Sequence, residues 1–256
     1  MIMKTLSKFH ALIVAIALSL LFLAGCASTP QTTYTSLEEM QDKRIGYVLA
    51  GITERMGKEH FPNATRVTFN SQMDAIAALQ AGQIDGAMVS YPTVFMVNKN
   101  IPELTWIEEP VENAQVGIGV KKGNTEILNH INACIGELKQ DGTLDDMISR
   151  WYNMENPNYT MPDIPLPTEG KPLIVAVSPD FEPSCFLNAN GSLVGLDVEL
   201  AYRIAKYMNR PIEFVDTPVA SRPSALESGK ADIVAANFAI DPVYEYVEFS
   251  QPYFDI

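Results

Sequence analysis

The residues that could contact a ligand follow short apolar segments, each of which is typical of a buried strand. In doubly wound α/β sheets, ligands bind beyond the carboxyl ends of the strands. Five segments at the ends of these predicted strands carry hydroxyl, amide, arginine or aromatic groups that suit a small polar solute: Gly51–Thr53, Ser90–Tyr91, Ser178–Phe181, Val219–Arg222 and Ala236–Asp241. The first of these opens a predicted helix, whose N-terminus favours an anion. The alternative interpretation of Gly51–Thr53 is a simple tight turn.

Patterns that would indicate an enzyme or a metal site do not occur in the sequence. We find no carboxylate pair and no nucleophile beside a base, which acid–base or covalent catalysis would need. No spacing is typical of metal ligands, since His60 and His130 stand alone and His10 lies in the amino-terminal leader. The sequence therefore predicts a binding protein that is not an enzyme and uses no cofactor or metal.

A repeated phrase indicates how the ligand segments are positioned. Residues 78–89 read ALQAGQIDGAMV, and residues 225–236 read ALESGKADIVAA. Each copy ends a helix-like segment at a glycine, which can take the left-handed conformation that stops a helix. Each then leads into an apolar strand. Two copies of one helix–strand unit predict two similar α/β lobes.

Hydrophobic periodicity predicts the other elements. Strands are expected at residues 44–50, 67–69, 84–89, 116–120, 173–177, 212–215 and 231–236, with a hairpin of 185–187 and 192–194 around Asn190-Gly191. Helices are expected over 125–139, 143–152 and 221–228, and from Thr53, Ser71 and Asp197; Ser71 and Thr143 begin capping boxes. Four prolines and Gly170 within residues 155–170 predict a semi-rigid linker.

The amino terminus has the features of a secretory signal. Lys4 and Lys8 precede an apolar run over residues 11–23, which is too short to span a bilayer comfortably, and the sequence LAGC ends at Cys26. Because LAGC matches the bacterial lipobox, we expect residues 1–25 to be a lipoprotein signal peptide, Cys26 to be lipidated and residues 26–36 to form a tether. The protein would then lie outside the cytoplasm, anchored to the cell membrane. The alternatives are a cleaved signal with a chance cysteine or an uncleaved anchor.

Charge and cysteine content restrict the possible partners. The formal net charge is −13, and it becomes −15 when the signal and its two lysines are removed. Nucleic acids and anionic membranes bind clusters of Lys and Arg, so this acidic chain argues against both partners. Apart from Cys26, the cysteines are Cys134 and Cys185. A disulfide could join them in an exported protein, but we favour two buried free thiols.

Eight segments together resemble the family-3 extracytoplasmic solute-binding proteins of ABC transporters, which are best known for binding polar amino acids. They are KRIGYVLAGITE, ALQAGQIDGAMV, GIGVKKGN and LKQDGTLDDMISRWY in the first half, and LIVAVSPDFEPSCF, LNANGSLVGLDVELAYRIA, ALESGKADIVAANFAI and VEFSQPYF in the second. The resemblance implies a two-lobed, periplasmic-binding-protein-like (type 2) α/β fold, each lobe a doubly wound sheet with flanking helices. It also implies a small solute held in a cleft between the lobes and an ABC permease as a partner.

The two halves stand in exchanged order relative to the family. Residues 37–154 resemble the family's C-terminal half and residues 171–256 its N-terminal half. The hinge strand expected after Phe254 is absent, because the sequence stops at Ile256. One interpretation is a circular permutation, in which the helices at 125–152 pack on the lobe built from 171–256. The other is a tandem array cut at both ends. We favour pairing into one cleft, because each half alone would expose a large apolar face.

The resemblance assigns roles to individual residues. Phe181 matches an aromatic residue that stacks on the ligand, and Thr53 matches one that binds carboxylate. Tyr244 stands where the family has an arginine for the α-carboxylate, Ser90 where it has an acid for the α-ammonium group, and Val219 where it has a second aromatic ring. Arg222 is either a displaced cation or a surface arginine that caps a loop. The candidate ligand-binding residues are Thr53, Ser90, Phe181, Arg222, Asn237, Ala239 and Tyr244.

Three functions are compatible with this pattern. The first is a lipid-anchored protein that closes over a small amino-acid-like or carboxylate solute and delivers it to an ABC permease. The second is a degenerate sensory or scaffolding lipoprotein without a transport ligand. The lost charged anchors favour it, because a buried zwitterion would lack partners for its ends. The third, more remote, is a dehydratase-like enzyme on the same scaffold.

Overall fold

The computed structural model describes residues 32–153, 155 and 159–256. The expected signal peptide, Cys26 and residues 27–31 of the expected tether lie outside the described residues, as do residues 156–158 of the expected linker. Residues 34–256 form one compact unit. Within the described ranges, no helix has both the length and the apolar character needed to cross a membrane.

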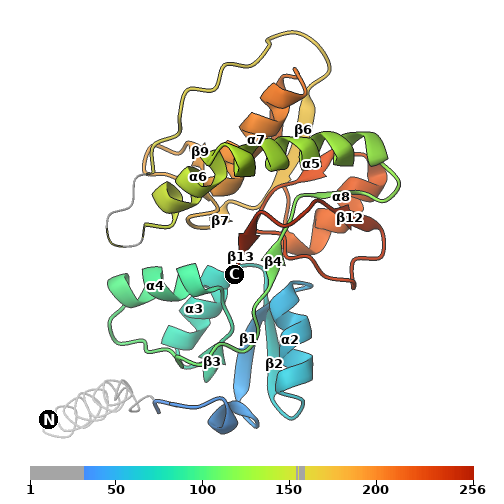
Figure 1. Ribbon diagram of the computed structural model, residues 1–256. Coiled ribbons are helices and arrows are strands. Elements are labelled where there is room, and N and C mark those ends of the chain that lie inside the picture. The colour runs from blue at the N-terminus through green and yellow to red at the C-terminus, as the bar shows by residue number, and fades with distance from the viewer. Residues whose placement is uncertain (1–31, 154, 156–158) are drawn as a thin grey trace, which may run out of the picture. The chain divides into compact units, whose positions relative to one another are not determined.

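Three parallel strands form the first sheet, in the order β2-β1-β3 (Figure 1). The strands are β1 (Arg44–Val48), β2 (Thr65–Phe69) and β3 (Gly86–Ala87); the helices are η1 (Glu38–Met40), α2 (Ile52–His60), α3 (Gln72–Gln80) and α4 (Tyr91–Asn100). Helices α2 and α3 both contact β1. The strand buries Ile45 and Tyr47, and α3 buries Ile76. Burial of these apolar side chains holds the helices on the sheet.

A second sheet of five strands combines segments from both halves of the chain. Its order is β10-β6-β11-β5-β12; β10, β6 and β11 run parallel, and β5 is antiparallel to both of its neighbours. The strands are β5 (Gly119–Lys121), β6 (Leu173–Val177), β10 (Ile212–Asp216), β11 (Ile233–Val234) and β12 (Val247–Phe249). The associated helices are α5 (Thr125–Gln140), α6 (Thr143–Trp151), α7 (Leu196–Tyr207), η2 (Val219–Ser221) and α8 (Arg222–Ser228).

One hydrophobic core holds these two sets of segments together. Ile131 and Trp151 from the first half belong to the same buried cluster as Val175 and Leu200 from the second. Helix α5 contacts α6 and α7, which lie beside it in Figure 1. Residues 119–151 therefore pack with residues 173–249. The circular-permutation interpretation, which requires this packing, stays a prediction.

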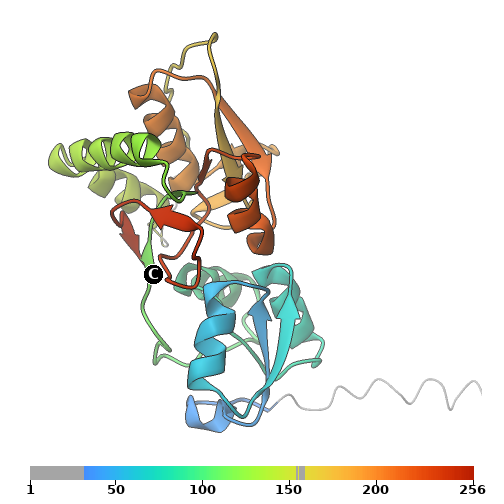
Figure 2. The same cartoon turned by 90° about the vertical axis from the view of Figure 1, so that its right-hand side faces the viewer.

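Two small sheets complete the fold. β13 (Phe254–Asp255) pairs antiparallel with β4 (Gln115–Val116), as Figure 2 shows, and β7 (Asp180–Phe181), β8 (Cys185–Leu187) and β9 (Leu193–Val194) form an antiparallel group. The expectation that no strand follows at this point was wrong. A short strand forms at Phe254–Asp255, and Ala114 and Ile256 extend its ladder through two backbone hydrogen bonds of 2.7 Å.

Several local predictions are confirmed. The repeated phrase occupies the same place in both sheets: α3 leads to β3 beside β1, and α8 leads to β11 beside β6. Gly229 ends α8 in the left-handed conformation, with a φ of 75°. The Ser71 hydroxyl accepts a hydrogen bond from the Asp74 N–H at 3.0 Å, as a capping serine does. The hairpin of β8 and β9 turns through Gly191, whose φ is 74°.

Other local predictions need correction. Thr143 does not cap α6, since Gly142 is the N-cap residue and the Thr143 N–H instead donates to Asp141 at 2.9 Å. The strand expected at 116–120 is divided between β4 and β5, and those expected at 84–89 and 231–236 pair over only two residues each. Helix α4 was not predicted.

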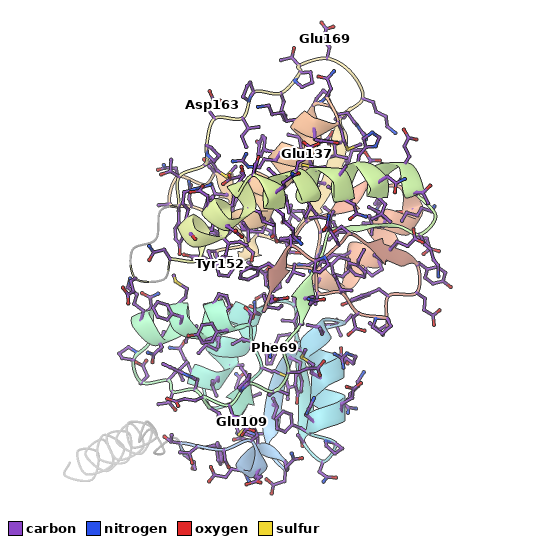
Figure 3. The ribbon with its side chains drawn as sticks, viewed as in Figure 1. Phe69, Glu109, Glu137, Tyr152, Asp163 and Glu169 are labelled. Carbon is purple, nitrogen blue, oxygen red and sulfur yellow. The ribbon has the colours of Figure 1, made fainter. Side chains whose placement is uncertain are left out.

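A buried carboxylate joins α6 to α7. Glu199 is 0% exposed and accepts hydrogen bonds from the guanidinium groups of Arg150 and Arg203, at distances of 2.7 to 3.1 Å. It also accepts one from the Trp151 indole N–H at 2.8 Å. At the end of α6, Tyr152 (labelled in Figure 3) shares a 2.6 Å hydrogen bond with the Ser184 hydroxyl. These contacts fix α6 to α7 and to the segment of Ser184, both of which belong to the second half of the chain.

The two described cysteines are Cys134 on α5 and Cys185 on β8. Both are buried and neither forms a disulfide, which confirms the favoured prediction. Burial raises the pKa of the Cys134 thiol to about 12. Both residues therefore act as small apolar side chains of the core.

Candidate functional site

Arg222, the first residue of α8, lies at the centre of the candidate site. It is only 2% exposed, and its guanidinium carbon lies 5.2 Å from the ring centroid of Phe181 and 5.7 Å from that of Phe238. At these distances both rings attract the cation. The interpretation of Arg222 as a surface residue was wrong, because two rings distant in sequence enclose it.

The Arg222 guanidinium is only partly satisfied by protein groups. Its Nε donates to the Ser178 hydroxyl at 3.1 Å, and that hydroxyl donates to the Thr217 carbonyl at 2.5 Å. One terminal nitrogen, Nη2, is buried and has no hydrogen-bond partner among the described residues. Burial lowers the pKa of Arg222, while the carboxylate of Asp180 opposes this shift. Arginine keeps its charge in proteins, so this region presents a buried cation with one free donor nitrogen.

Asn237 and Ala239, both predicted ligand contacts, follow β11. Asn237 has a φ of 49°, and its backbone N–H donates to the carboxyl group of Asp197. Asp197 thus occupies the backbone N–H of Asn237, while the Asn237 Oδ1 is buried without a partner among the described residues. Ala239 forms an isolated antiparallel bridge with Val116. Both residues hold Phe238 in place beside Arg222.

The carboxyl group of Asp197 should make the protein's stability depend on pH. Burial raises its pKa from 3.8 to about 6, although hydrogen bonds from Tyr253 and Asn237 oppose this shift. The folded state therefore binds this proton more tightly than the unfolded chain does. Its contribution to stability is complete below about pH 4 and is lost as the pH rises through about 6.

We expect the unfolding free energy of the wild type, measured by urea denaturation, to fall between about pH 4 and pH 7 relative to that of Asp197→Asn, which cannot ionise. The pH series for the two proteins gives this difference directly. A difference that does not change with pH would contradict the assignment of a raised pKa to Asp197.

A polar group beside the first sheet, which we call the Ser90 group, consists of Gln72, Ser90 and Thr93. The Ser90 N–H donates to the Gln72 Oε1 at 2.8 Å, and the Ser90 hydroxyl lies 3.0 Å from that of Thr93. Gln72, the first residue of α3, is 2% exposed, and its Nε2 has no partner among the described residues. Helix α3 contacts β7, which carries Asp180 and Phe181. The Ser90 group therefore lies on elements adjacent to the strand that holds Phe181.

Thr53 and Tyr244 lie at a second contact between the elements of the two sheets. The Thr53 hydroxyl accepts a hydrogen bond from the Val48 N–H at 3.4 Å, and the Tyr244 hydroxyl donates to the Ala50 carbonyl at 3.3 Å. The Glu54 carboxylate accepts from the Ala50 N–H at 2.8 Å. The carboxylate of Glu54 thus binds one of the backbone N–H groups that were expected to bind an anion at this turn.

An ion pair lies next to this contact. Arg55 on α2 donates to Asp241, which follows β11, at 2.6 Å. The same guanidinium donates to Glu59 at 2.6 Å and to Glu112 at 2.9 Å. These bonds join α2 of the first sheet to a loop of the second, in which the side chain of Asp241 is only 3% exposed.

His60 does not stand alone, contrary to the sequence interpretation. Its ring nitrogen lies 3.2 Å from a carboxylate oxygen of Glu112, and Glu59, His60 and Glu112 together have the spacing of possible metal ligands. All three are exposed, and Arg55 already pairs with both carboxylates. The cluster therefore has a counter-charge of its own, and we assign no metal to it.

Buried polar atoms without a partner concentrate at the candidate site. Of the five such side-chain atoms among the described residues, four lie on α3, β7, α8 or the segment after β11: Gln72 Nε2, Asp180 Oδ1, Arg222 Nη2 and Asn237 Oδ1. Buried polar groups are normally hydrogen-bonded, so such a concentration points to a ligand. Sequence reasoning included Asp180 only within a range and missed Gln72, whose sole signal was its place after the capping Ser71.

The family model for bacterial extracellular solute-binding proteins, family 3, matches residues 26–154 and 173–256. ABC transporter arginine-binding protein 1 of Escherichia coli (strain K12) is 26% identical over 125 residues, which are 47% of this chain and 51% of that protein. ABC transporter glutamine-binding protein GlnH of Bacillus subtilis (strain 168) is 31% identical over 97 residues, 37% of this chain and 34% of that protein. The chain thus spans about half the length of the first relative and about a third of the second.

A solved structure, an ancestral arginine-binding protein bound to glutamine, is 40% identical over 32% of this chain and 37% of its own, with a TM-score of 0.31.

Proposed function

The chain belongs to the bacterial extracellular solute-binding proteins of family 3, and we therefore propose that it binds a small amino-acid-like or carboxylate solute for an ABC uptake system. The solute would lie against Phe181 and Arg222 on the second half of the chain and reach the Ser90 group on the first. The protein would act by binding alone, without catalysis, and would pass its solute to a permease.

The observation that carries this proposal is the buried guanidinium of Arg222. It lies between two aromatic rings and offers Nη2 to no described protein group. A solute carboxylate would supply a charge-assisted hydrogen bond to this nitrogen, and the rings would exclude water from the pair. Arg222 would thereby replace the arginine that the family carries at the position of Tyr244.

The same observation favours a binding protein over a degenerate scaffold. A protein that had lost its ligand would gain stability by pairing or removing a buried charge, because a desolvated ion without a partner is costly. The bonds from Arg55 to Asp241 and from Tyr244 to Ala50 join elements of the two sheets, so they suit closure around a solute.

A thermal-shift screen of the full-length protein tests the function. The screen would compare amino acids, monocarboxylates, dicarboxylates and cyclic acids. A bound solute present at 100 times its Kd should stabilise the protein by about 2.7 kcal/mol. A scaffolding lipoprotein would be stabilised by none of these compounds, and a dehydratase would consume the one that stabilises it.

We also propose that Cys26 is lipidated and that the lipid holds the protein on the outer face of the cell membrane. The LAGC sequence that ends at Cys26 supports this proposal, as does the family's action outside the cytoplasm. Labelling of cells with a palmitate analogue tests it, because Cys26→Ser should remove the label from the protein.

A further inference from the structure

Two of the buried polar atoms that lack a partner at the candidate site are donors, one from each half of the chain. Gln72, the first residue of α3, is 2% exposed, and its Nε2 has no acceptor among the described residues. Arg222, the first residue of α8, is also 2% exposed, and its Nη2 is in the same situation. A buried donor without an acceptor is costly, so a ligand of this site should bring an acceptor to each nitrogen.

A backbone contact fixes the orientation of the Gln72 amide. The Gln72 Oε1 accepts from the Ser90 N–H at 2.8 Å, and an N–H requires an oxygen here rather than an NH₂ group. The amide therefore presents the hydrogens of Nε2, and not a lone pair, on its other side. Because Gln72, Ser90 and Thr93 are all neutral, the Ser90 group offers a solute a donor and no negative charge.

An acceptor lies on the strand that α3 contacts. Asp180 is the first residue of β7, and its Oδ1 is buried without a donor among the described residues. Arg222 and Asp74, which is in the first turn of α3, both influence the pKa of Asp180, so Asp180 lies within electrostatic range of both elements. Burial is the largest influence and raises this pKa, which favours the neutral form of the carboxyl group.

A hydroxyl group satisfies both Gln72 and Asp180, whereas an ammonium group satisfies only one of them. A hydroxyl has one hydrogen and two lone pairs, so it can donate to the Asp180 Oδ1 while it accepts from the Gln72 Nε2. An ammonium group has three hydrogens and no lone pair, so it would leave the Gln72 Nε2 unpaired. It would also bring a second positive charge into the same buried site as Arg222.

We propose that the solute is a hydroxycarboxylate rather than an amino acid, with its carboxylate on Arg222 and its hydroxyl between Gln72 and Asp180. This assignment rests on the proposed function and narrows it to carboxylates that carry a hydroxyl group. Gln72 is then the residue that selects against an amine. The serine at position 90, where the resemblance leads us to expect an acid, agrees with a neutral solute group on this side of the site.

Calorimetric titration with matched series of solutes tests the proposal. The first series is L-lactate, L-alanine and propionate; the second is L-malate, L-aspartate and succinate; the third is 3-hydroxybutyrate, 3-aminobutyrate and butyrate. The members of a series differ only in the hydroxyl, amine or hydrogen at one carbon. In the series that the wild type binds, the hydroxyl member should bind at least about 10-fold more tightly than either of the others, because each of them leaves buried groups unpaired.

Two variants of Gln72 test its role in this preference. Gln72→Glu keeps an oxygen for the Ser90 N–H but replaces the donor by a second acceptor, so the preference should reverse and the amine member should bind more tightly than the hydroxyl member. Gln72→Met removes the donor without adding a charge, so the ratio of hydroxyl to amine affinity should fall by about 10-fold or more. Circular dichroism checks that both variants are folded.

Gln80→Glu is the matched control. Gln80 is the exposed last residue of the same helix, and it makes the same chemical change about 12 Å further along the helix, where solvent screens the charge. Its preference should equal that of the wild type.

The proposal and the proposed function fail in different ways. A wild type that bound the amine member as tightly as the hydroxyl member would overturn the proposal alone, and so would Gln72→Met with an unchanged preference. A folded Gln72→Met protein that bound no member of the series would overturn it as well, because Arg222 should still hold the carboxylate. If the wild type bound none of these compounds, the proposed function would be overturned too.

Discussion

Replacement of Arg222 by glutamine should abolish most of the affinity for a carboxylate solute. The guanidinium is held by Ser178 and by two aromatic rings, and the solute would meet its remaining nitrogen in a site from which water is excluded. Removal of one partner of a desolvated, hydrogen-bonded charge pair costs about 2–5 kcal/mol, which corresponds to a loss of roughly 30-fold or more in affinity. Calorimetric titration with the best solute from the thermal screen measures the loss.

Two further variants separate binding from folding at Arg222. Arg222→Lys keeps the charge but cannot reach Ser178 and the solute with a planar fork, so its affinity should also fall. Arg210→Gln removes an arginine whose side chain is 17% exposed and which pairs with Asp232, away from the site, and it should bind solute as the wild type does. A folded Arg222→Gln protein with wild-type affinity would show that the carboxylate is bound elsewhere.

Replacement of Glu199 by glutamine should produce the largest loss of stability. The carboxylate is fully buried and accepts hydrogen bonds from Arg150, Arg203 and the Trp151 indole. Glutamine has a similar shape but no charge, so two guanidinium groups would lose their counter-ion. Loss of one member of a buried ion group costs about 3–5 kcal/mol. Urea denaturation followed by circular dichroism should show a lower midpoint with a similar m-value.

Asp146 offers a control on the same arginine. It accepts from Arg150 at 2.8 Å, but its side chain is 64% exposed, so Asp146→Asn should cost less than about 1 kcal/mol. If the two substitutions destabilised the protein equally, burial of Glu199 would not be the source of its effect.

The main elements of both sheets could be predicted from the sequence because their cores follow simple patterns. The helix–glycine–strand phrase predicted α3 with β3 and α8 with β11, and Asn190-Gly191 predicted the hairpin of β8 and β9. The strand formed at Phe254–Asp255 could not be predicted, because its partner β4 lies about 140 residues away. Pairing over such a separation depends on the packing of the whole chain rather than on local propensity.

The sequence indicated the position of the candidate site but not its internal contacts. The rule that ligands bind at strand ends selected the segments that carry Asp180, Arg222 and Asn237, each of which holds a buried polar atom without a partner among the described residues. The burial of Arg222 could not be inferred, because it depends on rings from β7 and from the segment after β11. The buried Oδ1 of Asp180 was missed for a related reason, since a carboxylate oxygen is recognised as unpaired only when the donors around it in the described structure are known.

Asp197 connects two parts of the molecule that are far apart in sequence. Its carboxyl group accepts from the Asn237 N–H and, at 2.6 Å, from the Tyr253 hydroxyl. Tyr253 directly precedes β13, and Asn237 directly precedes Phe238. We therefore expect a bend in the β13–β4 ladder to shift the Phe238 ring, which lies beside Arg222, through the side chain of Asp197. By reciprocity, a solute that fixes the Phe238 ring would also favour one bend of the ladder. The outer shape of the protein would then differ between the solute-free and the solute-bound state.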